Sequence, residues 1–327
     1  MEQLKRIDRR ERERRERWDL SPAATRSAES KGREEPEEPD PLRTAFERDR
    51  DRIVHCNAIR RLARKTQVFI DPENDHFVTR LTHTLQVAQI GRAMAIALGL
   101  NEALTEAICL GHDIGHAPFG HTGEDALAEI VAGGWVHSDH SVRILSVLEP
   151  LNLTWEVLDG IRAHPWRVET PPATPEGYLC RFADRIAYLS HDLIDAMRAD
   201  IIRYRDLPFR SQALLGDRHS RWVTAMVHAV VDRSTATGTV SMDLDVAEAM
   251  AELRAFMFER VYLRSEGRAH RHHAIKVVQD LVRHYETHPS EIPSTVPEGR
   301  TALEQAVDYV AGMTDRFASR AHSERCG

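Results

Sequence analysis

One segment of the chain, residues 110–124, carries most of the residue types that metal-assisted hydrolysis needs. It contains three histidines and two carboxylates within fifteen residues: His112, Asp113, His116, His121 and Glu124. Imidazole and carboxylate groups suit first-row divalent metals, and hydrolysis also needs proton carriers beside the metal. Gly115, Pro118 and Gly120 break the preceding apolar run, which keeps the later side chains close to the first two. The segment therefore predicts a metal-dependent hydrolase.

Two helical segments elsewhere in the chain would complete a set of metal ligands. In segment 80–94 the apolar residues repeat at helical spacing, and His83 lies on the same stripe. In segment 182–197 Asp184 lies on a polar face opposite an apolar one. A buried aspartate is costly unless it is paired or bound to metal. We therefore expect three helices to converge on one divalent ion, with these ligands: His83, His112, Asp113 and Asp184.

For any single histidine, the plainer interpretation is a hydrogen-bonded residue of the core, because buried polar side chains usually find ordinary partners. The dipeptide His-Asp also recurs at residues 191–192, so the dipeptide alone does not identify a metal site. The metal interpretation is favoured by the combination of His112 with His83, Asp184 and the neighbouring proton carriers.

Length and composition fit one large helical core. The chain has 327 residues, of which 42% are hydrophobic, enough to bury a single large core. Beyond residue 41 the pattern is one of repeated amphipathic helices, and only residues 238–242 could form a short hairpin. The predicted breaks between helices are 71–75, 133–134, 170–175 and 289–299. We predict an all-α fold with one domain from residue 41 to residue 327.

Charge and cysteine usage narrow the class of protein. A net charge of −7 is too small for a general polyanion binder, so an anionic substrate would need a local concentration of arginine and metal. The four cysteines show no Cys-x-x-Cys spacing and indicate reduced thiols. No apolar run approaches the ~18 residues of a membrane helix. The sequence thus favours a cytoplasmic protein without a membrane partner.

The first forty residues differ from the rest of the chain. Segments 11–17 and 34–40 are dense in charge and poor in large apolar side chains. Such a composition buries too little surface to offset its ordering entropy, so we expect a short Arg/Glu helix followed by a disordered acidic linker. The arm could serve nucleic acid or a neighbouring subunit, or be a solvated tail. A His/Arg cluster at residues 268–273 leaves a similar choice between anion binding and a solvated basic face.

Six further blocks of sequence accompany the ordered His83, His112–Asp113 and Asp184 set. They are residues 46–55, 60–69, 79–89, 133–137, 151–155 and 310–317. Together they resemble the HD-domain deoxynucleoside triphosphate triphosphohydrolases, a family of bacterial dGTPase-like enzymes with vertebrate relatives. The ordered His/Asp set is typical of the wider HD superfamily. Segment 110–124 and the Asp-x-x-x-Tyr-x-x-x-Asp pattern of residues 184–192 narrow the resemblance, which covers residues 41–319.

The resemblance implies an HD-domain helical fold and a reaction. A divalent metal such as magnesium or manganese would assist hydrolysis of dGTP or several dNTPs to deoxynucleoside and inorganic triphosphate. His121 and Glu124 would form a proton relay, because they are three residues apart at a helix start. His116 would lie near the α-phosphate. His137 would lie near the phosphates, whereas the neighbouring His140 matches no family position.

The resemblance also implies substrate contacts. Arg80 and Arg185 would bind phosphate, although a surface charge is the alternative for Arg80. Tyr188 would lie under the sugar and exclude a 2′-hydroxyl, the alternative being ordinary core packing. Asp192 and Gln67 would hydrogen-bond the 3′-hydroxyl.

Two other functions remain open from sequence. One is an HD phosphohydrolase on another nucleotide, such as a 5′-nucleotidase, although Arg185, Tyr188 and Asp192 argue against a monophosphate. The other is a nucleotide or single-stranded nucleic-acid sensor with little turnover, for which the His121–Glu124 relay would have no use. The family resemblance further implies a homo-oligomer, and a regulatory dNTP or weak single-strand binding would be additional partners.

Overall fold

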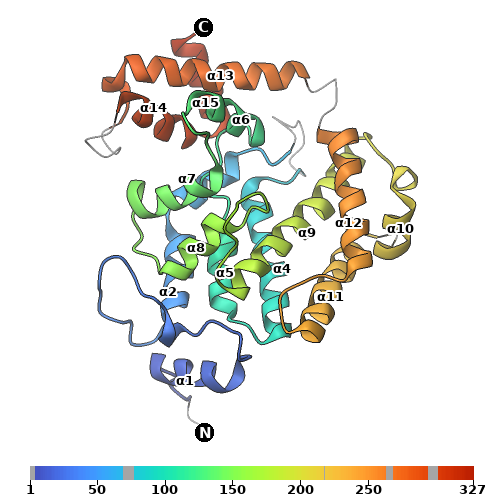
Figure 1. Ribbon diagram of the computed structural model, residues 1–327. Helices are drawn as coiled ribbons and strands as arrows, with labels where there is room; N and C mark the ends of the chain where they lie inside the picture. Colours follow the sequence, from blue (N-terminus) through green and yellow to red (C-terminus); the bar gives the residue numbers. More distant parts are fainter. Residues whose placement is uncertain (1–3, 69–76, 217, 263–267, 294–300) are drawn as a thin grey trace.

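The protein is described here by a computed structural model that covers residues 4–68, 77–216, 218–262, 268–293 and 301–327 (Figure 1). Within these ranges there are fifteen α-helices and no strand, and the two β-bridges are isolated pairs. The predicted all-α fold is confirmed. The helices are α1 Arg9–Asp19, α2 Ala45–His55, α3 Asn57–Arg61, α4 Arg80–Leu98, α5 Glu102–Gly111, α6 His121–Ile130, α7 His137–Arg143, α8 Trp155–Ala163, α9 Pro175–Arg198, α10 Phe209–Leu215, α11 His219–Thr237, α12 Leu244–Met257, α13 Arg268–Thr287, α14 Ala302–Ala311 and α15 Asp315–Arg325.

Local sequence explains where the main helices begin and end. Thr79 caps α4 by accepting the N–H of Thr82, and Gly99 ends that helix with a φ of 62°. Thr174 caps α9, whose first residue is Pro175. No hairpin forms at residues 238–242, since α11 ends at Thr237 and a short turn leads into α12. The predicted break at 71–75 lies outside the described residues.

The centre of the molecule is a layer of three helices, α4, α5 and α9, which pack against one another. Their apolar sides share one buried core that includes Val87, Ile108 and Ile186. Gly91 allows the close approach of α4 to α5, because a Cβ atom there would lie 2.9 Å from Cys109 Sγ. α2 and α8 pack against α5, while α11 packs against α9 and α4. This layer determines where the histidines and aspartates of segments 80–94, 110–124 and 182–197 meet.

A second core lies at the C-terminal end of the chain. Helices α13, α14 and α15, called here the C-terminal lobe, lie together at the top of Figure 1 beside α6. The buried side chains of this core include Val278, Val310 and Leu127 of α6. Phe119, from the segment between α5 and α6, is buried in the same core. The C-terminal lobe therefore packs directly on the segment that carries the predicted catalytic histidines.

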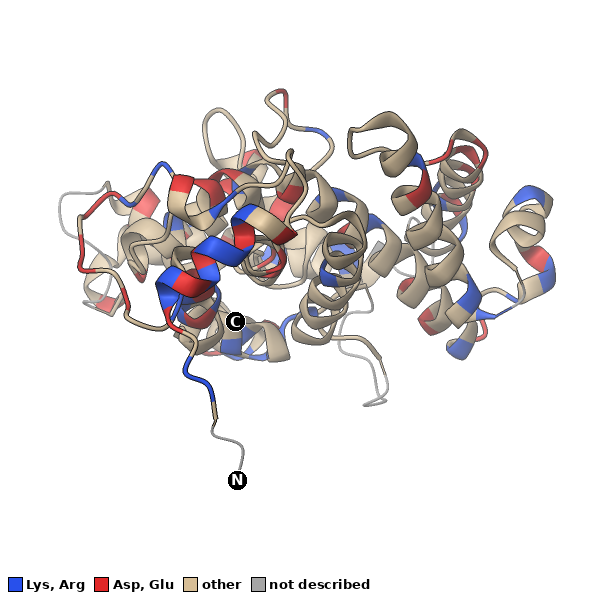
Figure 2. Ribbon diagram, turned by 90° about the horizontal axis from the view of Figure 1, so that it is seen from below, with Lys and Arg blue, Asp and Glu red and all other residues tan. Residues whose placement is uncertain are grey.

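The N-terminal arm departs from the prediction. The predicted Arg/Glu helix is present as α1, along which basic and acidic residues are interspersed (Figure 2). The structure does not show a disordered linker: residues 20–40 follow a defined path on which Ala24 and Ser27 are buried, while residues 34–36 are exposed. Carboxylates hold these residues: Ser27 donates to Glu16 of α1, and Thr25 donates to the buried Glu176 of α9. The prediction from composition considered only the burial of apolar surface. These residues are held instead by hydrogen bonds to charged carboxylates.

Arg33 makes the strongest of these contacts. Its guanidinium forms an ion pair with Asp49, a residue of α2 whose side chain is wholly buried. Asp49 also accepts hydrogen bonds from the backbone and hydroxyl of Thr154 at 2.9 and 2.6 Å.

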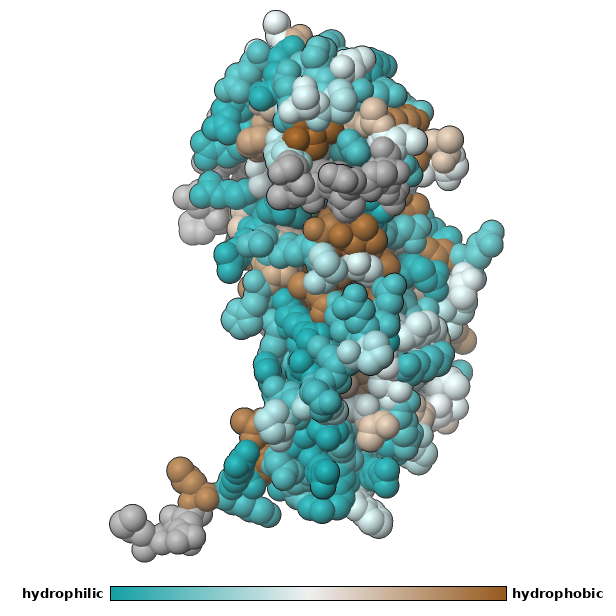
Figure 3. All heavy atoms as spheres, turned by 90° about the vertical axis from the view of Figure 1, so that its left-hand side faces the viewer, coloured by the Kyte–Doolittle hydropathy of each residue, from teal (hydrophilic) through white to brown (hydrophobic). Residues whose placement is uncertain are grey.

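The face formed by the arm is mostly hydrophilic, as the lower part of Figure 3 shows. No helix of the described residues is both long and apolar enough to cross a membrane.

Arg33→Met should lower the free energy of unfolding by about 3 kcal/mol, because it leaves Asp49 buried without its cation. Urea denaturation measures the loss. Arg14→Met is the matched control, since Arg14 lies on α1 with a mostly exposed side chain; its loss should stay within about 0.5 kcal/mol. Equal stability of wild type and Arg33→Met would show that the Arg33–Asp49 ion pair contributes nothing to folding.

Candidate active site

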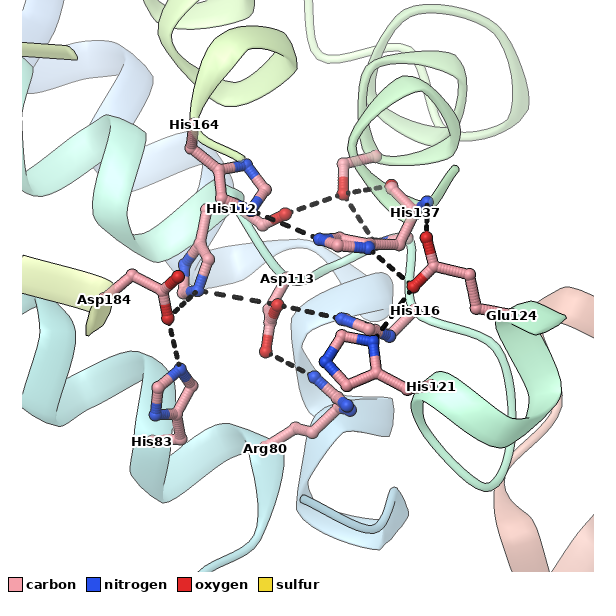
Figure 4. A network of polar contacts seen from close by, with 12 residues as sticks. Arg80, His83, His112, Asp113, His116, His121, Glu124, His137, His164 and Asp184 are labelled. Atoms are coloured by element: carbon pink, nitrogen blue, oxygen red, sulfur yellow. Dashed lines mark hydrogen bonds and ion pairs between the residues drawn. The ribbon is translucent and has the colours of Figure 1, made fainter. Parts of the chain in front are cut away.

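The central helices bring the predicted ligand residues together (Figure 4). His83 lies one turn into α4, His112 and Asp113 directly follow α5, and Asp184 lies in the third turn of α9. His83 Nε2 is 3.1 Å from Asp184 Oδ1. His112 Nε2 is 3.8 Å from the same oxygen and 3.5 Å from Asp113 Oδ1. Asp184 is half-buried and the other three residues are buried.

The hydrogen bonding of His112 indicates what this cluster can bind. Its Nδ1 donates to the carbonyl of Cys109 at 2.7 Å, so the neutral ring presents a lone pair at Nε2. That atom is buried and has no hydrogen-bond partner among the described residues. It faces two carboxylate oxygens, which are acceptors as well. Acceptors that face one another in this way need a cation between them, and imidazole with carboxylate suits a divalent metal.

The protonation states agree with this interpretation. Burial opposes ionisation of Asp184, but the hydrogen bond from His83 lowers its pKa to about 2. Burial likewise opposes ionisation of Asp113, yet the charge of Arg80 and the hydrogen bond from His116 hold its pKa well below the usual range. Both carboxyl groups are therefore ionised at neutral pH, as metal ligands must be.

A second group of side chains centres on Glu124, at the start of α6. Its carboxylate accepts hydrogen bonds from His121 Nδ1 at 3.1 Å and His137 Nδ1 at 3.0 Å, and it pairs with Arg167. Burial opposes ionisation of Glu124, but the bonds from His121 and His137 lower its pKa far below the usual range. The His121 side chain is 73% exposed, so it can reach a ligand in solvent. The predicted His121–Glu124 contact is present.

His116 joins the two groups. Its Nε2 is 3.3 Å from Asp113 Oδ1, and its ring stacks on His137 with centroids 3.9 Å apart. Burial and the nearby Arg80 and His137 lower the pKa of His116 well below the usual range. A neutral His116 between the carboxylate cluster and the Glu124 group can accept or donate a hydrogen bond without adding charge.

His164 was not predicted from the sequence. Its Nδ1 donates to the carbonyl of Ile161 at 2.7 Å, and its Nε2 lies 3.2 Å from His137 Nε2. Burial and the neighbouring His112 and His137 lower the pKa of His164 to about 3, so its Nε2 accepts. His137 thus lies between Glu124, 3.0 Å from its Nδ1, and His164. In sequence His164 follows an ordinary amphipathic helix and has no carboxylate within four residues, so no motif marked it.

Two arginines border the cluster. Arg80 is 2% exposed and donates to Asp113 Oδ2 at 2.7 Å, so the surface-charge alternative does not apply. Its Nε and Nη2 atoms find no partner within the described ranges. The guanidinium of Arg185 lies 4.3 Å from the centre of the Trp166 ring, and its Nε is also unpartnered among these residues. Buried guanidinium donors without partners fit an anionic ligand.

The predicted sugar-binding residues lie on α9 and the segment before α4. Tyr188 is half-buried, and Gln67 Oε1 has no partner in the described part of the chain. Asp192 is buried and accepts a hydrogen bond from the Tyr262 hydroxyl at 2.8 Å. The contact between Tyr262 and Asp192 was not predicted from the sequence. The structure also places Arg254 of α12 beside Tyr188. No sequence motif surrounds Arg254, so this contact could not be predicted.

Other histidines do not join the site. His191 Nδ1 bonds the carbonyl of Ala187 at 2.7 Å, so the histidine of the second His-Asp dipeptide is satisfied within its own helix. His140 is buried near Asp308 instead of the carboxylate cluster. The exposed His270–His273 residues lie on α13, where Arg271 pairs with Asp125 at 2.6 Å, in keeping with a solvated face.

Asp184→Ala should abolish metal-dependent stabilisation. A ligand that binds only the folded state stabilises it by about 2.7 kcal/mol at one hundred times its dissociation constant. We expect thermal unfolding of wild type with added manganese to show a gain of this order and the variant to show none. His191→Ala, from the same helix, should keep the gain. A full gain in Asp184→Ala would remove this residue from the ligand set.

Asp192 should make stability fall as pH rises. Burial, together with nearby acidic groups, raises its pKa to about 8, against 3.8 for an ordinary aspartate. The folded state thus holds this proton more tightly, and the stability it contributes is lost between about pH 4 and pH 8. Asp192→Asn keeps the size and the acceptor for Tyr262 but cannot ionise. Urea denaturation of metal-free protein from pH 5 to pH 9 should therefore give a flatter profile for the variant, and identical profiles would contradict the assignment.

Comparison with known proteins identifies the family. Residues 80–189 match the HD domain model, and residues 240–324 match the phosphohydrolase-associated domain model. A protein from Caldanaerobacter subterraneus subsp. tengcongensis is 47% identical, covering 93% of this chain and 91% of its own. Relatives from Desulfatibacillum aliphaticivorans (44%; 91% and 92%) and Clostridium perfringens strain SM101 (41%; 93% of each) carry the same name, "Deoxyguanosinetriphosphate triphosphohydrolase-like protein". The chain belongs to this dGTP triphosphohydrolase-like family of HD-domain proteins.

Proposed function

We propose that the protein hydrolyses deoxynucleoside triphosphates, dGTP or several dNTPs, to a deoxynucleoside and inorganic triphosphate. The observation that carries the proposal is the buried cluster of His112, Asp113 and Asp184, whose acceptor atoms face one another. Proton-carrying side chains and unpartnered guanidinium donors lie beside it. The name shared by relatives along nearly the whole chain supports the substrate class.

The residues that would hold the divalent metal are His83, His112, Asp113 and Asp184. Ligand atoms of His83, His112 and Asp184 lie close enough together to share one ion, and so do those of His112, Asp113 and His164. When bound, such an ion offsets charge on a phosphate oxygen and lowers the pKa of a water molecule. The second ring nitrogen of His112 bonds the Cys109 carbonyl, which fixes the orientation of the ring. Arg80 bonds Asp113 and would direct its unpartnered donors to the phosphates, and Arg185 would offer its unpartnered Nε as a further donor.

The Glu124 group would supply the proton for the leaving oxygen. Water attack on the α-phosphorus that breaks the bond to the 5′-oxygen releases an alkoxide, a poor leaving group that needs an acid. His121 is exposed and would donate this proton, while Glu124 orients its ring through Nδ1. His137 and His164, on the other side of Glu124, would keep that carboxylate ionised and in place. The oxygen of the attacking water then remains in the triphosphate.

The sugar would lie over α9. Tyr188 would exclude a 2′-hydroxyl, and Asp192 with Gln67 would bond the 3′-hydroxyl. The hydrogen bond from Tyr262 fixes the Asp192 carboxyl in position. Because the pKa of Asp192 is about 8, its carboxyl group carries a proton at neutral pH and can donate as well as accept.

The products test the proposal most directly. Manganese-loaded protein should convert one or more dNTPs, and not the matching NTPs, into deoxynucleoside and triphosphate, measured by chromatography. In water enriched in ¹⁸O the label should enter the triphosphate. Formation of dNMP and pyrophosphate would reject this bond assignment, and conversion of nucleoside monophosphates alone would favour a 5′-nucleotidase.

His121→Ala should lower kcat about a hundredfold or more, the usual contribution of a general acid. His121 is solvent-exposed and is not among the proposed ligands, so metal content and thermal stability should stay near those of wild type. His272→Ala, an exposed histidine on α13, is the control and should retain activity. Wild-type kcat in His121→Ala would assign the acid to another residue.

A further inference from the structure

A buried lysine links the C-terminal lobe to the active-site segment. Lys65 is almost completely buried, and its Nζ donates to the carbonyl of Ala311, at the end of α14, at 2.9 Å. The same Nζ donates to the carbonyl of His116. The backbone carbonyl of Lys65 accepts the N–H of Arg80 at 3.3 Å. One residue thus contacts the lobe, the segment between α5 and α6, and the start of α4.

Asp315, the first residue of α15, makes a parallel link. Its Oδ1 accepts the backbone N–H of Phe119 and its Oδ2 accepts that of Thr66, both at 2.9 Å. Both amides lie close in sequence to residues of the proposed site. Thr66 directly precedes Gln67, and Phe119 lies two residues before His121. A single carboxylate therefore fixes the spacing between these two backbone segments.

The backbone at this point adopts a conformation that needs external support. Phe119 has a φ of 64°, a value that non-glycine residues rarely adopt, and its ring is buried in the core of the C-terminal lobe. Gly120 follows with a φ of 61°, and a Cβ atom there would lie 2.9 Å from Arg80 Nη2. The turn at Phe119 and Gly120 thus brings the backbone close to the guanidinium of Arg80. The hydrogen bond from Phe119 N–H to Asp315 holds this turn in place.

We propose that Lys65 and Asp315 are positioning residues, through which the C-terminal lobe sets the geometry of Gln67, Arg80 and the His116–His121 segment. Neither side chain belongs to the metal cluster or to the Glu124 group. Their partners are backbone atoms that flank the proposed catalytic and substrate residues. The kinetic part of this inference rests on the proposed function, whereas the structural part does not.

The chain offers a matched control for lobe docking. Asp308 of α14 is also buried and also joins the lobe to the body, through its ion pair with Arg143 of α7 at 2.7 Å. It makes no hydrogen bond to residues 65–67 or 113–121 among those described. Asp308→Asn should therefore weaken docking of the lobe without loosening the active-site segment.

The test compares Asp315→Ala, Asp315→Asn, Lys65→Met and Asp308→Asn. With the dNTP that wild type hydrolyses fastest, Asp315→Ala and Lys65→Met should lose tenfold or more in kcat while metal content stays at the wild-type level. KM should rise as well in Asp315→Ala, because Gln67 loses its support. Asp315→Asn keeps one acceptor oxygen and should lie between Asp315→Ala and wild type. Asp308→Asn should lose thermal stability but keep kcat within twofold.

Amide hydrogen exchange gives a readout that needs no turnover. Peptides covering residues 65–68 and 113–121 should exchange at least tenfold faster in Asp315→Ala, and at the wild-type rate in Asp308→Asn. If wild type hydrolyses no dNTP, the proposed function fails while hydrogen exchange still tests the link. If Asp315→Ala does not fold, Asp315→Asn carries both comparisons. Wild-type exchange and kcat in the Asp315 variants, or equal losses in Asp308→Asn, would overturn the proposal.

Discussion

The structure depends on one electrostatic constraint: the buried His112 Nε2 lone pair faces two ionised carboxylates. The Nδ1 bond to Cys109 fixes the ring, and Asp113 and Asp184 lie 3.5 and 3.8 Å from Nε2. Without a cation, this arrangement would bury repelling groups at considerable cost. The packing of α4, α5 and α9 brings the three helices close enough for that constraint to exist. The arginines and the Glu124 group then take their positions around it.

The site divides into regions of opposite character that share His116. On one side, the carboxylates of Asp113 and Asp184 are ionised and can bind a cation. On the other, Glu124 accepts hydrogen bonds from His121 and His137 and forms an ion pair with Arg167. Proton carriers and the metal cluster therefore come from different elements, α6 and α7 on one side and the central layer on the other. The C-terminal lobe contacts the segment between them, so the accuracy of the whole site depends on how that lobe docks.

The positions of the metal-binding residues could be predicted from the sequence where helical periodicity of apolar residues marked one face of a helix. His83 and Asp184 lie on helices whose apolar stripes are visible in sequence, and His112 ends such a stripe, so their convergence could be inferred. His164, Lys65 and Asp315 could not be found, because their roles come from contacts between segments far apart in the chain. The arm was predicted wrongly beyond α1 for a related reason. Composition counts apolar surface, whereas Arg33 and Thr25 bind buried carboxylates of α2 and α9.

The central claim is that a single divalent ion lies between His83, His112, Asp113 and Asp184. Anomalous scattering from crystals grown with manganese, with data at two wavelengths, would locate every such ion in the molecule. We predict one strong peak per chain within coordination distance of His112 Nε2 and the two carboxylates. No peak there, in crystals of a protein that hydrolyses dNTPs with manganese, or a peak confined to another cluster, would contradict the account.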